Sequence, residues 1–430
     1  MPYKSFTHTQ DYLQRAKKVI PTASQTFSKS YYALPDKVSP LFLTQGKGAI
    51  VSDIDGNQFT DFVNGLLAVS LGYQDKDVDN AVLKQLRQGV SFSLPHIIET
   101  ELAELLVELI PCAEKVRFGK NGSDATSAAI RLARAYTGKE HIAVCGYHGW
   151  QDWYIGSTSR NLGVPESSKR LTHPFAYNDI TSLKSTFEQC DGQLAAVIME
   201  PMNIAYPQPG YLQSVREFCS QNNVVLIFDE TITGFRFDIG GAQKLFGVTP
   251  DLATFGKGMA NGYPISAVVG CNKVMALMED IFFSGTFGGE TLSIAASIAT
   301  INKLRKDNIP NYLKTLGEKL ISGLKEIINQ HDMADYFSVS GHPSWSFLNV
   351  NNGKNYSSVQ LKSLLLQELI ENGFLSLGSH NLSYAHSIED IEQLLCSYKK
   401  ILPFIREVDN NQSLAEVFRG EYLKPVFKVR

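Results

Sequence analysis

The sequence lacks an excess of charge of either sign. Its 430 residues include 40 Lys and Arg against 43 Asp and Glu, for a formal net charge of −3. A nucleic-acid-binding chain is expected to carry a basic excess or stripe, so we predict no nucleic-acid partner. At roughly 100–200 residues per domain, the length predicts two or three domains with a large buried core.

Long apolar runs and paired cysteines are also missing. No run approaches the ~20 residues that span a bilayer, and the amphipathic start of the chain has no signal-peptide core. The six cysteines are scattered without a C-x-x-C pair, which is typical of free thiols in a reducing compartment. We therefore expect a soluble, cytoplasmic protein with no membrane partner.

Motifs for metal binding are incomplete as well. Residues 48–65 alternate apolar and polar side chains around Asp55-Gly56, which predicts a β-hairpin. The same segment opens like a calcium loop, but Asn64 stands where that loop needs a bidentate Glu. His380 and His386 lack a third ligand at metal spacing. We predict no metal site.

What the sequence does contain, from about residue 100, is an alternation of helical patterns with short apolar runs. Helical spacing predicts helices over 101–110 and 123–136. The apolar runs, which are typical of buried parallel strands, cover residues 141–145, 194–199, 224–228 and 252–255. Ligands bind at the carboxyl ends of such strands. The residues expected at those ends are Tyr147, Glu200, Asp229 and Lys257.

After about residue 310 the pattern changes to Leu- and Ile-rich helices, at 312–329 and 358–372, with a strand-like piece at 344–350. This indicates a smaller α+β domain. The predicted division is an N-terminal segment (1–65) that contributes to the small domain, a large ligand-binding domain (66–310), and a C-terminal small domain with a tail (311–430). The tail after residue 408 has no predicted structure.

Two charged residues stand at predicted strand ends. Burying the charge of Asp229 at the end of an apolar strand costs free energy unless the carboxylate has a partner. Asp229 therefore either caps a turn or pairs with the protonated ring nitrogen of pyridoxal phosphate (PLP). Lys257, between two glycines, is either a surface lysine or a desolvated Schiff-base lysine. The glycines would let the backbone approach a cofactor closely.

Further candidates are a phosphate site and an aromatic ring. Gly122 and Ser123 open the helix predicted at 123–136, where free N–H groups would bind a phosphate; an ordinary Ser N-cap is the alternative. Tyr147 would stack on a flat heteroaromatic ring, or pack as a core aromatic.

In their order along the chain, these motifs resemble the class III PLP aminotransferases, within the aspartate-aminotransferase superfamily. The resemblance runs from about Asp55 to Ile391 and is nearest to the branch that contains glutamate-1-semialdehyde aminomutase. It rests mainly on residues 121–134, 146–149, 227–236, 255–258 and 285–291. It implies the α/β PLP fold type I, in which a large domain with a mostly parallel seven-stranded sheet is joined to a smaller α+β domain.

The resemblance also implies roles for matching residues. Lys257 would form the Schiff base with PLP and move the proton between Cα and C4′. Asp229 would pair with the pyridine nitrogen, between Tyr147 on one face of the ring and Thr231 on the other. The remaining implied contacts are Gly122 and Ser123 at the phosphate, Glu200 near the ring, and Thr286, which in the family reaches the phosphate of the neighbouring subunit. A homodimer with shared active sites is therefore expected.

The chain departs from the aminomutase where substrate should be recognised. Residues 22–28 replace its Gly-Gly-Val-Asn-Ser, residues 377–386 lack its acidic residue, and Gly-Glu-Thr at 289–291 replaces Gly-Asn-Pro. Residues 148–154 and 288–291 are more similar to the aminotransferases of bacterial surface-sugar biosynthesis, including the type that makes 8-amino-3,8-dideoxyoctulosonate.

Three functions follow as hypotheses. The first is a transaminase that moves an amino group from an amino acid, L-glutamate, to an aldehyde or ketone. Its acceptor would be a sugar or sugar acid such as a 3-deoxy-octulosonate derivative, in carbohydrate or lipopolysaccharide biosynthesis. His148, Trp150 and Glu290 would contact this polyhydroxylated substrate, although tryptophans here would also serve to pack the domain. The second is an intramolecular 2,1-aminomutase, and the third an inactive PLP-fold scaffold.

Overall fold

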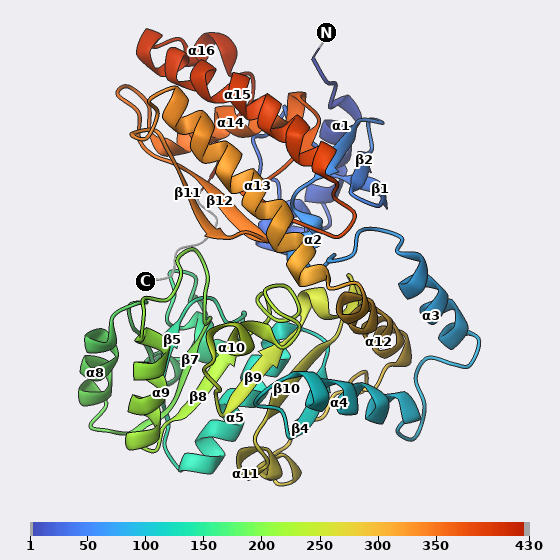
Figure 1. Cartoon of the computed structure of the whole chain (residues 1–430), viewed down its shortest axis with the longest axis vertical. Helices are drawn as coiled ribbons and strands as arrows, with labels where there is room; N and C mark the ends of the chain where they lie inside the picture. The colour runs from blue at the N-terminus through green and yellow to red at the C-terminus, as the bar shows by residue number, and fades with distance from the viewer. Residues whose placement is uncertain (1–2, 425–430) are drawn as a thin grey trace. The chain divides into compact units, whose positions relative to one another are not determined.

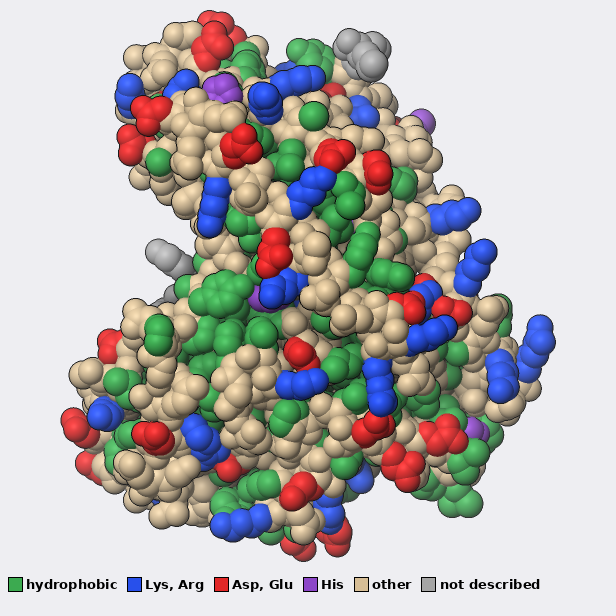
Figure 2. Space-filling view, viewed as in Figure 1, with side chains coloured by type: hydrophobic (Ala, Val, Ile, Leu, Met, Phe, Trp, Pro, Cys, Tyr) green, Lys and Arg blue, Asp and Glu red, His purple; other side chains and the backbone are tan. Residues whose placement is uncertain are grey.

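The computed structural model describes residues 3–424 and divides into two compact units. Among the described residues, the smaller unit holds residues 3–67, Leu71–Asp75 and residues 312–424, whereas the larger unit holds Ala68–Ser70 and Lys76–Asn311. Figure 1 traces both along the chain. Among the described residues, no helix is both long and apolar enough to cross a membrane. On the face shown in Figure 2, acidic and basic side chains are interspersed.

A seven-stranded sheet forms the centre of the larger unit, in the order β4-β10-β9-β8-β7-β5-β6. Its strands are β4 (Lys115–Gly119), β5 (His141–Cys145), β6 (Thr172–Pro174), β7 (Leu194–Met199), β8 (Val225–Asp229), β9 (Leu252–Phe255) and β10 (Ser266–Gly270). The strands from β9 to β6 pair in parallel, and β10 is antiparallel to both of its neighbours. The predicted mostly parallel sheet is confirmed.

Burial explains why these segments form the centre of the sheet. Every residue of β7, β8 and β9 is buried, so their side chains have to be apolar on both faces of the sheet. The four apolar runs identified in the sequence correspond to β5, β7, β8 and β9.

Helices surround this sheet in the larger unit. The longer ones are α3 (Lys76–Leu86), α4 (Ile97–Leu109), α5 (Gly122–Thr137), α8 (Ile180–Gln189), α9 (Tyr211–Gln221) and α12 (Thr291–Lys306). Short turns of helix are α6 (Asp152–Ile155), α7 (Glu166–Lys169), α10 (Gly241–Phe246), α11 (Asn272–Met275), η3 (Lys257–Ala260) and η4 (Ala276–Glu279). Both helices predicted in this unit, α4 and α5, are confirmed. The face of α5 that carries Ala125, Ala129 and Leu132 is fully buried in the core.

The smaller unit contains two sheets. One has the order β1-β2-β3-β13 and the other β11-β12-β14. Their strands are β1 (Leu43–Lys47), β2 (Ile50–Asp53), β3 (Gln58–Asp61), β11 (Phe337–His342), β12 (Trp345–Val350), β13 (Phe374–Leu375) and β14 (Ser379–Asn381). Strands β2 and β3 pair antiparallel around Asp55-Gly56, which confirms the predicted hairpin. The parallel pair β3–β13 joins the N-terminal and C-terminal parts of the chain into one unit.

The helices of the smaller unit are α1 (Thr7–Lys17), α2 (Asn64–Leu67), α13 (Ile309–Gln330), α14 (Ser358–Glu371), α15 (Ile388–Asn411) and α16 (Leu414–Val417). Capping boxes begin α14, at Ser357, and α15, at Ser387. The tail begins inside α15 and continues through α16, and its last six positions, 425–430, lie outside the described residues.

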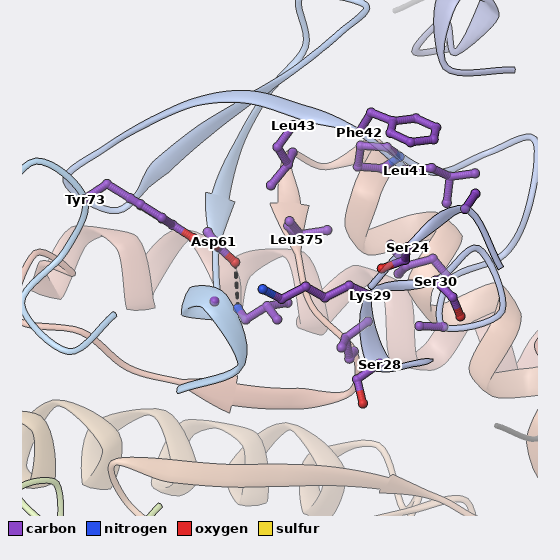
Figure 3. Close-up of a pocket in the computed structure, with 17 residues that line it drawn as sticks. Ser24, Ser28, Lys29, Ser30, Leu41, Phe42, Leu43, Asp61, Tyr73 and Leu375 are labelled. Carbon is purple, nitrogen blue, oxygen red and sulfur yellow. Dashed lines mark hydrogen bonds between the residues drawn. The ribbon is translucent and has the colours of Figure 1, made fainter. Parts of the chain in front are cut away.

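A cavity of about 360 Å³ opens in the smaller unit (Figure 3). Asp61 on its wall is fully buried and accepts hydrogen bonds from Tyr73 Oη and from the backbone N of Val63, each 2.7 Å long. Lys29 extends along the cavity toward Asp61. Ser24 and Ser28 also line it. They belong to the segment whose sequence departs from the aminomutase.

Candidate active site

Parallel pairing brings the predicted residues to one edge of the large sheet. Tyr147 lies two residues beyond β5, Glu200 directly follows β7, Asp229 ends β8, and Lys257 lies two residues beyond β9. Because these strands are parallel neighbours, their carboxyl ends meet at the same edge. The larger unit therefore gathers there a lysine, two carboxylates and an aromatic ring.

Both carboxylate oxygens of Asp229 take part in hydrogen bonds. One oxygen, Oδ1, accepts from the backbone N of Thr231 at 3.1 Å, from Thr231 Oγ1 at 2.5 Å and from Thr254 Oγ1 at 3.0 Å. The other oxygen, Oδ2, lies 2.9 Å from His148 Nδ1. Burial raises the pKa of Asp229, but the bonds and charge of His148, together with the Thr231 donors, outweigh burial and bring it below the ordinary value. Asp229 is thus a buried carboxylate that stays charged.

His148 lies behind this carboxylate. It is only 2% exposed, and its Nε2 lies 3.1 Å from the carbonyl oxygen of Cys145. A carboxylate and a carbonyl are both acceptors, so His148 fills both bonds only when both ring nitrogens carry protons. The sequence places His148 at the substrate; in the structure its ring nitrogens are directed instead to Asp229 and to the backbone.

Lys257 combines burial with an unusual backbone conformation. It begins η3 at a φ of +42°, in the left-handed region, directly after Gly256. Burial lowers the pKa of Lys257; Glu200 and Asp229 oppose that shift, and Arg236 adds to it. The amine therefore loses its proton more easily than an exposed lysine, as a nucleophile or a general base requires.

Glu200 is buried beside the same edge. Its Oε2 accepts from the backbone N of Tyr147 at 3.1 Å and from Asn203 Nδ2 at 2.7 Å. Burial and the charge of Asp229 raise the pKa of Glu200, against opposing contributions that include His148. Glu200 thereby fixes the loop that carries Tyr147.

The first turn of α5 forms a cradle with two neighbouring loops. Ser123 Oγ accepts from the backbone N of Trp150 at 3.3 Å. A Cβ added to Gly149 would lie 2.3 Å from Ser123 Oγ, and one added to Gly122 would lie 3.2 Å from Thr231 Cγ2. The approach of Gly149 to Ser123 therefore requires glycine, whereas a side chain at Gly122 would crowd Thr231. Free N–H groups at the start of a long helix, together with a hydroxyl, suit a phosphate, so the donor set fits a phosphate-bearing cofactor next to Asp229.

The remaining predicted residues lie in different surroundings. Tyr147 is half exposed and contacts Tyr154 edge-on, with ring centroids 5.7 Å apart. Trp150 is 65% exposed and Thr286 is exposed on a loop. Both aromatic side chains therefore keep a large exposed fraction.

Glu290 caps α12. Its carboxylate accepts from the backbone N of Leu292 at 2.7 Å and of Ser293 at 3.2 Å, and pairs with Lys120 Nζ at 2.9 Å. The sequence places Glu290 at the substrate, but these bonds already engage both carboxylate oxygens.

Sequence reasoning missed Thr254 and Asn203, which bind the two carboxylates. Thr254 lies opposite Asp229 in the β8–β9 register. Its place three residues before Lys257, in a predicted strand, is a signal that would have identified it once β8 and β9 were paired.

Comparison with known proteins identifies the class. Residues 31–381 match the family described as aminotransferase class III. The chain is 35% identical over 405 residues to the 3-aminobutyryl-CoA aminotransferase of Cloacimonas acidaminovorans, covering 92% of this chain and 96% of the relative. It is 34% identical over 423 residues to the glutamate-1-semialdehyde 2,1-aminomutase of Francisella philomiragia, covering 91% and 97%. The chain belongs to the class III aminotransferases.

A solved structure agrees with this assignment. The PLP form of the FumI protein of Sphingopyxis sp. MTA144 superposes with a TM-score of 0.86 at 28% identity, covering 94% of this chain and 97% of that one. The chain therefore has PLP fold type I and is a PLP-dependent transaminase.

Proposed function

We propose that this transaminase takes an amino group from an amino acid, L-glutamate, and delivers it to the carbonyl carbon of a sugar or sugar acid. The observation that carries the proposal is that a buried, hydrogen-bonded carboxylate, Asp229, and a buried lysine, Lys257, lie at the carboxyl ends of the neighbouring parallel strands β8 and β9. PLP, when bound, supplies an electron sink for the electrons left when a Cα proton departs.

Each group of the chain then has a distinct task. With PLP bound, Lys257 Nζ would hold the cofactor and, once displaced by the donor amine, would act as the base that takes the Cα proton. Asp229 would favour a protonated ring nitrogen, and the hydrogen bond from His148 stabilises the charged form of Asp229. Ser123 and the first N–H groups of α5 would hold the phosphate.

The acceptor is assigned from the aromatic and neutral polar groups near the site. The exposed faces of Tyr147 and Trp150 suit a polyhydroxylated molecule, such as a 3-deoxy-octulosonate derivative of surface-carbohydrate biosynthesis.

A second candidate is a 2,1-aminomutase, because the chain is 34% identical to enzymes of that name over most of its length. A further acceptor to test is a β-keto acyl thioester, since another relative is named for 3-aminobutyryl-CoA. The inactive-scaffold reading is disfavoured because Lys257 and Asp229 are both present.

The test is made in two steps. Holoenzyme is first mixed with L-glutamate alone; the proposal expects the absorbance to shift to that of the amine form, with release of one 2-oxoglutarate per site. Lys257→Ala should abolish the shift, whereas Lys184→Ala, an exposed lysine on α8, should leave it unchanged. Absence of the shift with glutamate would overturn the donor assignment.

In the second step the isolated amine form meets 3-deoxy-octulosonate-type keto sugars, 3-oxobutyryl-CoA and glutamate 1-semialdehyde in turn. The proposal expects the original spectrum to return fastest with the sugars. A faster return with the thioester would replace the acceptor. With the semialdehyde, release of 5-aminolevulinate without consumption of glutamate would establish the aminomutase.

A further inference from the structure

Two histidines and a cysteine meet at the amino-terminal edge of the large sheet. One ring nitrogen of each histidine, His141 and His173, and the Sγ of Cys190 all lie within 4.8 Å of one another, and His141 Nδ1 lies 2.8 Å from His173 Nε2. We propose that these three side chains bind a thiophilic divalent cation, Zn²⁺, at a structural site separate from the cofactor site.

Regular secondary structure holds all three ligands in place. His141 begins β5, His173 is the middle residue of β6, and Cys190 directly follows α8. The β5–β6 ladder pairs Ala143 with His173, and the backbone N of His141 donates to Gln193 O at 3.2 Å. The N of Gln193 in turn donates to Cys190 O at 2.8 Å. The cluster is therefore not formed by freely moving surface side chains.

The separations are close to those that zinc requires. Imidazole nitrogens bind Zn²⁺ at about 2.0–2.1 Å and thiolates at about 2.3 Å in a tetrahedral arrangement, so ligand atoms lie roughly 3.3–3.7 Å apart. The two nitrogens, 2.8 Å apart, would have to separate by about 0.5 Å, and the sulfur, within 4.8 Å of them, would have to approach by up to about 1.2 Å, which side-chain rotation allows. Three protein ligands leave the fourth position for water. Cys190 is buried, whereas both histidines are partly exposed and leave an entry path.

Zinc binding at this site involves proton release but no change of oxidation state. The Cys190 thiol gives up its proton to solvent as the sulfur binds the ion. In the hydrogen-bonded pair one ring carries the shared proton, and that proton moves to the other nitrogen of the same ring, so each imidazole binds as a neutral ligand. One proton is released for each ion bound.

The position of the site indicates a structural role. His141 is the first residue of β5, and the cofactor-edge residues follow the last residue of that strand, about 13 Å further along at the ordinary rise. An ion there would fasten the edge strand β6 to β5 and to the turn after α8. Without an ion, the same side chains form only a hydrogen-bonded histidine pair beside a buried thiol.

Cobalt(II) titration of the chelator-treated holoenzyme tests the proposal. Wild-type protein should bind one Co²⁺ per chain with intense tetrahedral d–d bands and a thiolate-to-cobalt charge-transfer band, and Zn²⁺ should remove both. Zn²⁺ should also raise the melting temperature, because it binds the folded state. Cys190→Ser should lose the charge-transfer band, and His173→Gln should weaken binding more than about tenfold.

Matched variants keep the test decisive. Cys396→Ser and His8→Gln remove an exposed thiol and an exposed imidazole elsewhere, and both should bind Co²⁺ as the wild type does. An unchanged PLP spectrum in each variant shows that the larger unit is folded. Octahedral spectra only, or equal binding by wild type and Cys190→Ser, would overturn the proposal. Because the readout is metal binding, its failure is independent of the transaminase reaction.

Discussion

At the scale of single residues, the central feature is a carboxylate whose charge is fixed by its neighbours. Asp229→Asn keeps the shape of the side chain but removes the charge that would hold a proton on the ring nitrogen. We expect kcat of the glutamate half-reaction to fall by about 10²–10³, the cost of losing one buried electrostatic contact. Asp307→Asn, at an exposed position, should leave kcat unchanged. A loss below about threefold in Asp229→Asn would contradict the role given to Asp229.

Lys257 gives a prediction for pH. Burial lowers its pKa below the ordinary lysine value of 10.5, so the neutral amine appears at lower pH than in an exposed lysine. Cofactor-free protein should therefore take up PLP faster as pH rises, with a half-maximal rate below the pH found for a lysine peptide in the same buffer. The pKa of Lys257 is lower in the folded protein than in the unfolded chain. The free energy of unfolding of the cofactor-free protein should therefore increase as pH rises from the folded-state pKa toward 10.5. Stopped-flow absorbance measures the uptake; a midpoint equal to that of the peptide would refute the desolvation argument.

At the scale of elements, the loop after β5 and the start of α5 depend on a close backbone approach. Gly149 has a φ of +109°, and an added Cβ would lie 2.3 Å from Ser123 Oγ. Gly149→Ala should push Ser123 out of the cradle at a cost of about 1–3 kcal/mol, which weakens PLP binding roughly ten- to a hundredfold.

A second glycine provides the control for that change. Gly163 has a φ of +86°, but a Cβ there would meet nothing within 4 Å. Gly163→Ala should therefore lower the melting temperature slightly through backbone strain while the dissociation constant for PLP, from absorbance titration, stays the same. Equal PLP affinity in both variants would contradict the cradle.

The elements also show what the sequence could predict. Strands β5, β7, β8 and β9 are continuous apolar runs, because a central parallel strand is buried on both faces. Strands β4, β6 and β10 were not predicted from the sequence. Alternating exposure breaks the apolar run in β4, and β6 has three residues and ends in a proline, as only an edge strand tolerates.

The candidate site was predictable only in part, for a related reason. Lys257, Asp229 and Ser123 are marked by their local sequence, since each follows or begins a recognisable element. Partners that meet across strands, such as Thr254 and the ring of His148, depend on register and loop path. One sequence does not contain that information.

At the scale of the whole molecule, the family resemblance implies a homodimer in which Thr286 completes the neighbouring site. The exposed position of Thr286 leaves it available to a second copy. Lys257→Ala and Thr286→Arg homodimers should each have low activity. When the two are unfolded and refolded together, the mixed dimer regains one intact site, so activity should return. No recovery in a mixture whose sedimentation shows dimers would mean that each chain forms its site alone.

Lys257 is the residue expected to carry the cofactor. Reduction of the PLP-loaded protein with borohydride, followed by digestion and mass spectrometry, attaches a pyridoxyl group permanently to the lysine that held it. We predict the group on the peptide that contains Thr254-Phe-Gly-Lys257-Gly, and none in protein first converted to the amine form by glutamate. Attachment to any other lysine would contradict the account.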